Sequence, residues 1–233
     1  MTESHGEPQD LNLDKVTIGI IGGTGAQGTG LAYRLARAGF GVVLGSRDAS
    51  KAVLAADLIG LGVRGMSNPE CASATDVVII AVPWDSHQET ISSLTDLLMG
   101  KIVIDCVNPM GFDSAGAFVL ATEAGSAALE AQILLPDSFV VSAFNHVSAV
   151  VLSDVNIDEV EMDILITGNN KKATDFSQLL VDRIKGMRGI YAGKLRNSGQ
   201  VEALTANLIS INRRYKIHAG IRITGLDSIN LNL

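Results

Sequence analysis

Aromatic residues and long apolar runs are scarce in this chain of 233 residues. Aromatic side chains make up 4% of it, and no apolar run approaches the ~20 residues that a membrane-spanning helix needs. Residues 1–14 are polar and acidic rather than signal-like, so we expect a disordered tail there and a cytoplasmic protein without a membrane segment. Cys71 and Cys106 form no Cys-X-X-Cys pair and lie near no histidine cluster, which favours reduced core thiols over a disulfide or a metal site.

Positive charge is also in deficit, because the formal net charge is −7 at pH 7. Nine of the 18 Lys and Arg residues nevertheless lie in one basic segment between Arg183 and Arg222, where Glu202 is the single acidic residue. Nucleic-acid-binding proteins usually carry positive charge more broadly, so we expect no nucleic-acid partner and an anionic small molecule near this segment. A solvated helix face is the alternative.

Small and aliphatic residues dominate a chain that is 47% hydrophobic, and they recur in short runs. Helices are predicted between most of these runs, and the alternation indicates a Rossmann-type, doubly wound α/β fold with a mostly parallel sheet. Residues 108–126 are loop-rich and show no clear period. The predicted strands are Val16–Ile21, Val42–Leu44, Val77–Val82, Ile102–Ile104, Phe139–Ser142, Asp163–Thr167 and Gly189–Ala192.

Helix signals are clearest at a few positions. Gly39 and Gly100 are expected to end helices, and Pro69 to occupy the first position of another. One long helix is predicted from Gln200 to Gly220, with a single apolar seam that packs on the domain's own sheet or on a partner subunit. The seam residues are Val201, Leu204, Leu208, Ile211 and Tyr215.

The most informative motif is a short apolar strand that runs through Gly23-Thr24-Gly25-Ala26-Gln27-Gly28 into an amphipathic helix. Gly23 permits a tight turn, Gly25 lets the backbone approach a pyrophosphate, and Gly28 allows close packing of helix on strand. The phosphates would lie at the helix N-terminus. Glycines at this spacing are weak evidence alone, but between a strand and a helix they predict a dinucleotide site.

The residues after the second strand favour NADP(H) over NAD. An NAD-binding protein usually places Asp or Glu about 20 residues past the glycines, where it accepts hydrogen bonds from the adenosine ribose. That place holds Gly45, Ser46 and Arg47, with Lys51 one helical turn further on, and these polar and cationic groups suit a 2′-phosphate. The alternative is that Asp48 is the ribose-binding acid, displaced by a residue or two.

A second ligand is expected over the carboxyl ends of the strands. Three segments follow strand ends there, namely Val82-Pro83-Trp84, Asn108-Pro109-Met110 and residues 144–149. Trp84, Met110, Asn145 and His146 are suited to contacting a flat ring. Alternatively, Trp84 is a half-buried core aromatic and His146 caps a helix that begins at Ser148.

The chain resembles the NADPH-dependent reductases of coenzyme F-420, an 8-hydroxy-5-deazaflavin, which are called F-420H2:NADP oxidoreductases. The likeness covers about Val16 to Leu226 and rests on the glycine loop, Ser46-Arg47 with Lys51, Val82-Pro83-Trp84, VVSAFN at 140–145, and Leu195-Arg196-Asn197 leading into VEALT. The run NRRYKIHAGIRITG is especially similar to bacterial members. The resemblance implies hydride transfer between NADP(H) and coenzyme F-420, with an NADP-binding Rossmann domain at 15–195 and a small helical domain at 196–233 that closes the coenzyme site.

The resemblance also implies roles for individual residues. Thr24, Gly25, Ala26 and Gln27 would contact the pyrophosphate, and Ser46, Arg47 and Lys51 the 2′-phosphate. Val82, Trp84, Asn108, Met110 and Ala149 match positions that line the nicotinamide half. Archaeal members carry a histidine near the deazaflavin where this chain has Asn145, and His146 could take over from it. Lys194, Arg196, Arg213 and Arg214 are candidates to hold the acidic coenzyme tail.

Two other functions stay open at this level. The cytosolic domain of the STEAP metalloreductases also resembles the chain in Ser46-Arg47, Asn108-Pro109 and Phe144-Asn145, which keeps a soluble NADPH-dependent flavin or ferric reductase as an alternative. The other is a module that senses NADP(H) without turnover. Hydride transfer between two stacked rings requires neither a metal nor a nucleophile, and we expect small-molecule coenzymes as ligands in a homodimer.

Overall fold

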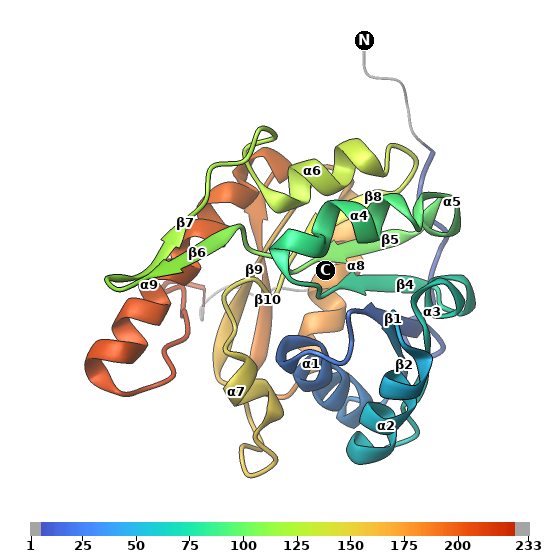
Figure 1. Ribbon diagram of the computed structural model, residues 1–233, viewed down its shortest axis with the longest axis horizontal. Helices are drawn as coiled ribbons and strands as arrows, with labels where there is room; N and C mark the ends of the chain where they lie inside the picture. Colours follow the sequence, from blue (N-terminus) through green and yellow to red (C-terminus); the bar gives the residue numbers. More distant parts are fainter. Residues whose placement is uncertain (1–5, 227–233) are drawn as a thin grey trace.

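The computed structural model describes residues 6–226, in which an eight-stranded sheet is flanked by helices (Figure 1). In chain order the elements are β1 (Thr17–Ile21), α1 (Ala26–Arg37), β2 (Gly41–Ser46), α2 (Ala49–Ile59), β3 (Arg64–Ser67), α3 (Asn68–Ala74), β4 (Val77–Ile80), the 3-10 helix η1 (Trp84–Ser86), α4 (His87–Ser92), α5 (Thr95–Leu98), β5 (Ile102–Asp105), β6 (Met110–Asp113), β7 (Gly116–Val119), α6 (Ala127–Leu134), β8 (Phe139–Ser142), α7 (Ala149–Ser153), β9 (Met162–Gly168), α8 (Lys171–Asp182), β10 (Met187–Gly193), the 3-10 helix η2 (Leu195–Asn197) and α9 (Ser198–Tyr215).

Six strands of the sheet run parallel in the order β3-β2-β1-β4-β5-β8, which is the doubly wound order that the alternation of strands and helices indicated. β9 pairs antiparallel with β8, so that Val141 lies opposite Gly168, and β10 pairs parallel with β9. The predicted Rossmann-type fold class is confirmed. Its parallel strands bring the carboxyl ends of β1, β4, β5 and β8 to one edge of the sheet.

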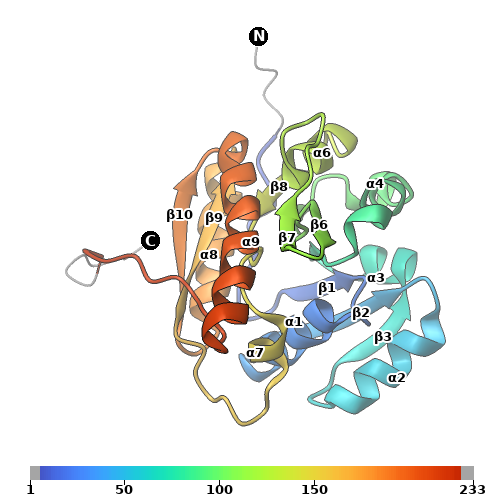
Figure 2. The same cartoon turned by 60° about the vertical axis from the view of Figure 1, so that its left-hand side comes forward.

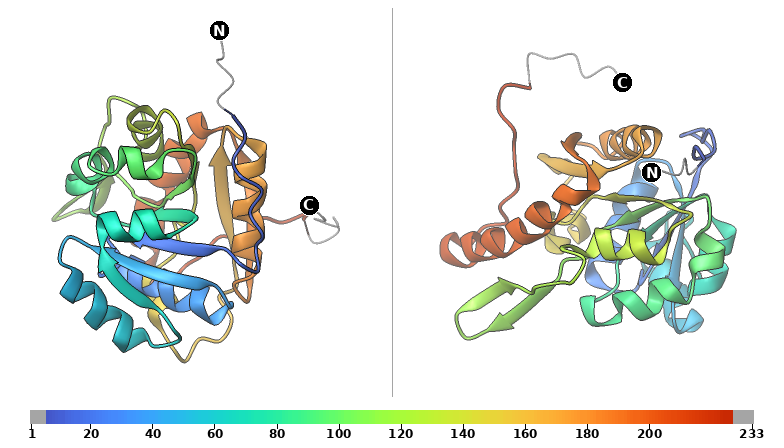
Figure 3. Two further views of the ribbon diagram at one scale, coloured as in Figure 1. Left: turned by 90° about the vertical axis from the view of Figure 1, so that its right-hand side faces the viewer. Right: turned by 90° about the horizontal axis from the view of Figure 1, so that it is seen from above.

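Alternate residues of the central strands pack into two cores, one on each face of the sheet. Ile79 of β4 belongs to the core covered by α1, α2, α7 and α8, whereas Ile80 belongs to the core covered by α3 to α6. Both side chains are fully buried, as parallel strands between two helical layers require (Figure 3). Cys71 and Cys106 are buried free thiols, as predicted.

Three strands were not predicted. Arg64–Ser67 forms the edge strand β3, and residues 108–126, expected to be loop-rich, contain the antiparallel hairpin of β6 and β7. All three strands are short and contain no fully buried residue, so they lack the apolar pattern that identifies a strand in sequence. The hairpin instead packs through β7 against α9, a contact that only the folded chain shows.

Of the four predicted helix boundaries, the two glycine ends are confirmed and the other two differ. Gly39 and Gly100 follow helix ends with positive φ, as predicted. Pro69 stands at the second position of α3 rather than the first, because Ser67 is the N-cap and forms a capping box with Glu70. The last helix begins at Ser198 and stops at Tyr215, short of Gly220, because Lys216 turns left-handed at φ 54°.

α9 and the β6–β7 hairpin lie side by side and project from the rest of the molecule (Figures 1 and 2). We call them the projecting arm. Val201 and Leu208 of the predicted seam are buried, whereas Ile211 and Tyr215 near the tip are exposed. The division into domains at residue 195 stays a prediction. Across residues 6–226, no helix is long and apolar enough to cross a membrane.

Candidate functional site

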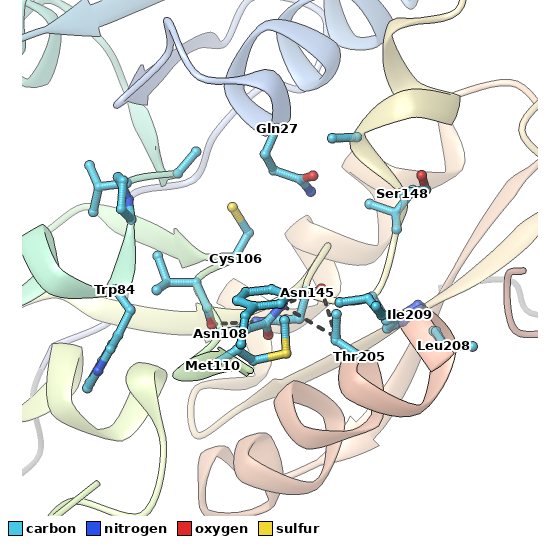
Figure 4. Close-up of a pocket in the computed structure, with 18 of the residues that line it drawn as sticks. Gln27, Trp84, Cys106, Asn108, Met110, Asn145, Ser148, Thr205, Leu208 and Ile209 are labelled. Carbon is cyan, nitrogen blue, oxygen red and sulfur yellow. Dashed lines mark hydrogen bonds between the residues drawn. The ribbon is translucent and has the colours of Figure 1, made fainter. Parts of the chain in front are cut away.

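A cavity of about 600 Å³ opens at the carboxyl ends of the parallel strands (Figure 4). The loops after β4, β5 and β8, which we expected to converge, all contribute to its wall, and the projecting arm supplies the opposite wall. The lining residues include Gln27 of α1, Val82–Asp85, Cys106–Asn108, Met110 and Phe112 of β6, Asn145–Ala149, and Thr205, Leu208, Ile209 and Asn212 of α9. Thr205 was noted only as part of the VEALT run, and Phe112 was not predicted to lie here.

The glycine loop has the backbone shape of an anion site. The left-handed turn falls at Gly22, with φ 75°, rather than at Gly23 as predicted. Gly23 is needed for a different reason, because a Cβ there would lie 2.7 Å from the Leu44 side chain. A Cβ on Gly28 would lie 2.7 Å from the Gly23 Cα, which confirms the predicted close packing of helix on strand. α1 begins at the N-cap Gly25 without a side-chain cap, so its first N–H groups have no side-chain acceptor there.

The corner predicted for the 2′-phosphate lies at the end of β2. Ser46 is buried and its Oγ accepts a hydrogen bond from the Asp48 N–H at 3.2 Å. Asp48 is the N-cap of α2, because its carboxylate accepts from the Ser50 N–H at 3.0 Å and the Lys51 N–H at 3.4 Å. The Ser50 hydroxyl lowers the pKa of Asp48 further. Arg47 and Lys51 are exposed, and their side chains form no ion pair with any residue in 6–226.

One hydrogen-bond hub ties the loops after β5 and β8 to α9 (Figure 4). The Asn145 carbonyl accepts from Asn108 Nδ2 at 2.7 Å and from Thr205 Oγ1 at 3.0 Å. The Asn145 side chain is also engaged, since Nδ2 donates to the Val107 carbonyl at 3.2 Å and Oδ1 accepts from the Ser142 hydroxyl at 3.0 Å. Within the described part of the chain, the buried Asn108 Oδ1 has no partner.

His146 is held neutral beside this hub. Its Nε2 accepts from the Leu165 N–H at 3.1 Å, so the ring proton must lie on Nδ1. Burial lowers the pKa of His146 to about 4. Nδ1 has no hydrogen-bond partner among the residues described. His146 does not cap the following helix, because the N-cap of α7 is Ser148. It can therefore donate one hydrogen bond but carries no charge at neutral pH.

Trp84 is a half-buried core aromatic, and its contact with a ring of the ligand stays a prediction. It is partly buried against the core between the sheet and α3 to α6, and it also lines the cavity. Its ring lies 5.4 Å from that of His87, centroid to centroid. Val82 and Met110 line the cavity near it, and Ala149, the first residue of α7, lines it from the side of α1.

Behind Trp84 lies a buried cluster of charged residues that the sequence did not reveal. His87 Nε2 lies 2.6 Å from Asp105 Oδ2, and His87 Nδ1 lies 3.2 Å from Glu130 Oε1. Burial disfavours the charged imidazole, but the two carboxylates outweigh this effect and raise the pKa of His87 above its ordinary value. These residues are 18 and 25 positions apart, a spacing without a motif, so only the fold brings them together.

The basic segment is dispersed in space. None of its nine Lys and Arg residues lines the cavity. Arg188 and Arg222 pair with the buried Asp163, Arg183 pairs with Asp14, and Lys185 pairs with Asp158 and Glu159. Lys194 donates to the Asn169 carbonyl at 3.1 Å. Arg213 and Arg214 directly follow Asn212, which lines the cavity, whereas Lys194 and Arg196 precede α9 at its other end.

Comparisons with known proteins give one consistent family. A family model described as NADP oxidoreductase, coenzyme F-420-dependent, matches residues 17–109. The chain is 39% identical over 221 residues to the F-420-dependent NADP reductase of Methanothermobacter marburgensis, a match that covers 90% of this chain and 98% of that protein. It is 30% identical over 207 residues to the human metalloreductase STEAP2, covering 85% of this chain but 38% of STEAP2.

The solved structures show the same fold. A candidate F-420-dependent NADP reductase from Arthrobacter sp. superposes with a TM-score of 0.75 at 21% identity, and the match covers 89% of this chain and 99% of that chain.

Proposed function

The chain belongs to the family of F-420-dependent NADP reductases, and we propose that it transfers a hydride between NADP(H) and the deazaflavin coenzyme F-420. The observation that carries the proposal is the match over almost the whole length of a reductase of that name. STEAP2 is matched over 38% of its length, so that resemblance concerns one part of a larger protein.

The residues of the glycine loop and of the β2 end fit NADP(H). The uncapped N-terminus of α1 offers N–H donors to a pyrophosphate. Arg47 and Lys51 are exposed cations without a carboxylate partner in residues 6–226, which suits a 2′-phosphate. Asp48 has its carboxylate directed at the N–H groups of α2, and this speaks against the alternative in which it binds the ribose of NAD. We therefore assign the 2′-phosphate to Ser46, Arg47 and Lys51.

We infer that the cavity of about 600 Å³ holds the reacting rings of the two coenzymes. The bound coenzymes supply the redox chemistry, and the protein has to hold their reacting atoms close together and exclude water. Val82, Met110 and Ala149 supply apolar contacts for the nicotinamide half. Asn108 Oδ1 and His146 Nδ1 are buried without a partner among the described residues, and we propose that they serve as one acceptor and one donor for the rings. Asn145 shapes the site through its carbonyl rather than through a free side chain.

A direct assay tests the proposal. Purified protein is mixed with NADPH and oxidised F-420, and the deazaflavin absorbance is followed, with NADH and flavin mononucleotide as parallel substitutes. We expect NADPH-dependent bleaching of F-420. Reaction with the flavin alone would replace the proposal with a flavin reductase, and tight NADPH binding without any turnover would replace it with a sensor.

We propose that Arg213 and Arg214 hold the acidic tail of F-420. They follow the cavity residue Asn212, whereas Lys194 and Arg196 lie about 25 Å away along α9, at 1.5 Å per residue. Changing both arginines to alanine should raise the KM for F-420 roughly tenfold at low salt, and less at high salt, because exposed charges are screened. The matched control changes Lys194 and Arg196 to alanine. An unchanged KM for the first pair and a raised KM for the control would move the tail to the other end of α9.

We also propose a homodimer formed through the projecting arm. Large apolar side chains are exposed on it, namely Phe112, Phe118, Val119, Ile211 and Tyr215, with exposed fractions from 38% to 69%. An apolar patch of this kind on a surface arm is typical of a subunit interface. Sedimentation should give twice the chain mass of 24.4 kDa, and changing Phe112 and Tyr215 to serine should give the monomer. A monomeric parent protein would contradict this assignment.

A further inference from the structure

Glu202 is a buried carboxylate that the hydride transfer itself does not use. It lies in the second turn of α9 with an exposed fraction of 2%, and it does not line the cavity. Its Oε2 accepts from the Ala127 N–H at 2.8 Å and its Oε1 accepts from the Ala128 N–H at 3.2 Å. These are the first two N–H groups of α6, and the N-cap Ser126 serves the third through its hydroxyl. Glu202 therefore joins one helix end to another helix.

The cavity wall is continuous with this joint. Thr205 lies three residues after Glu202, on the neighbouring turn of α9, and donates to the Asn145 carbonyl in the hub. Leu208 and Ile209 follow on the next turn and line the cavity. α9 is also held by the Ser198 hydroxyl, 2.7 Å from that of Thr167, and by its contacts with β7. The Glu202 joint lies one turn from Thr205, so a change at this joint should shift the wall that faces the rings.

The surroundings of Glu202 place the protonation of its carboxylate close to neutral pH. Among the elements packed on α9, α6 contributes Glu130, η2 contributes the exposed Arg196, and β7 has no titratable residue. Behind α6 lie Asp105 and His87. Burial, assisted by the negative charge of Asp105, raises the pKa of Glu202 to about 7, although the α6 N–H groups and His87 pull it down. The carboxylate is ordinarily ionised from pH 4.5 upward, so in the fold its titration is moved into the neutral range.

We propose that Glu202 is a positioning residue: its ionised carboxylate locks α9 across the coenzyme cavity, and protonation releases the lock. An ionised carboxylate offers a charged acceptor to each of the two N–H groups, whereas a protonated one has a neutral hydroxyl as one of its two oxygens. Protonation thus removes the charge from both hydrogen bonds, weakens the one to the hydroxyl oxygen most, and loosens α9 beside the hub. This inference rests on the proposed function for its kinetic consequence but not for the structural one.

The structural arm of the test uses the protein alone. In NMR spectra recorded from pH 5.5 to 8.5, the amide resonances of Ala127, Ala128 and Thr205 should titrate together with a midpoint near 7. The Glu202→Gln variant should show no such titration, whereas Glu123→Gln, which changes an exposed acid before α6, should behave as the parent does. If Glu202→Gln does not fold, Glu202→Asp replaces it, since a shorter acid should move the midpoint. Amides that do not titrate in the parent would overturn the proposal.

The kinetic arm compares KM values for F-420 across the same pH range. If binding of F-420 requires ionised Glu202, the KM for F-420 should rise about tenfold between pH 8 and pH 6, and kcat should change less. F-420 titrates in its own right, so the readout is the ratio of the variant KM to the parent KM. That ratio should be large at pH 8 and approach one at pH 6. A constant ratio would overturn the lock, whereas absence of any F-420 turnover would contradict the proposed function and leave the NMR result standing.

Discussion

Replacing His87 with leucine should lower the free energy of unfolding by about 3–5 kcal/mol, the usual cost of leaving a buried charge without its partner. Asp105 is fully buried, and its Oδ2 lies 2.6 Å from His87 Nε2. Glu130 faces the other ring nitrogen. With leucine between them, the two carboxylates would lose their common cation. For a chain of this length the melting temperature should fall by roughly 10 °C, which differential scanning calorimetry measures.

Two further variants separate charge from packing. Adding Asp105→Asn to His87→Leu removes the stranded charge, so the double variant should be more stable than the single one. His218→Leu, at an exposed position outside the core, should leave the melting temperature within about 2 °C of the parent value. A His87→Leu protein as stable as the parent would mean that the cluster contributes no net stability, as some buried ion pairs do.

The same cluster gives stability a definite pH dependence. The pKa of His87 is raised in the fold, so its contribution is fully present below the ordinary value of 6.5 and is lost as the pH rises through the folded value. Glu202 acts in the same direction, because a raised carboxyl pKa makes the folded state bind a proton that the unfolded chain has lost. Stability should therefore decline between pH 4.5 and about 7 as Glu202 is titrated, and decline further above pH 6.5 as His87 loses its proton, whereas the lock on α9 tightens as Glu202 ionises.

The contrast between the glycine loop and the buried cluster explains what the sequence could predict. Gly28 and the turn before it lie in one continuous segment, where a strand, a turn and a helix follow each other within a dozen residues. The constraint is local, and the sequence shows it. Glu202 was visible as an acid within a basic segment and as part of the VEALT run, but its partners are the backbone N–H groups of residues more than 70 positions away. No sequence spacing encodes such a contact.

For the basic segment, the sequence predicted one shared site that the fold does not form. Charges that are neighbours in sequence indicated a single anion site, but the fold sends four of the nine to carboxylates. Arg188 meets Asp163 across β9 and β10, and Arg183 meets Asp14 near the start of the chain. Likewise, the hairpin was missed because its strands are stabilised by α9 rather than by a buried face of their own. The mostly parallel sheet and the convergence of its loops followed from the alternation of strands and helices, whereas charge pairing depends on tertiary contacts.

Replacing Arg47 with alanine should weaken NADPH binding at least tenfold and leave NADH binding nearly unchanged. A hydrogen bond to a charged group contributes roughly 1.5–3 kcal/mol, which corresponds to a tenfold to hundredfold change in the dissociation constant. Arg47 is exposed and forms no ion pair in residues 6–226, so its removal should not disturb the fold. Asp48 would still cap α2 and keep the backbone of the β2 end in place. Titration calorimetry with both nucleotides measures the two constants.

The matched control is Arg64→Ala on the edge strand β3. Arg64 is exposed like Arg47 but pairs in register with Val43, three residues before Ser46, and so lies away from the carboxyl edge where the phosphates would bind. It should change neither affinity, which shows that general loss of positive charge is not the cause of the Arg47 effect. An equal loss of NADPH and NADH affinity in Arg47→Ala would place that guanidinium on the shared pyrophosphate instead. The selectivity for NADP(H) would then have to come from Lys51 and the buried Ser46 hydroxyl, whose Oγ already accepts from the Asp48 N–H.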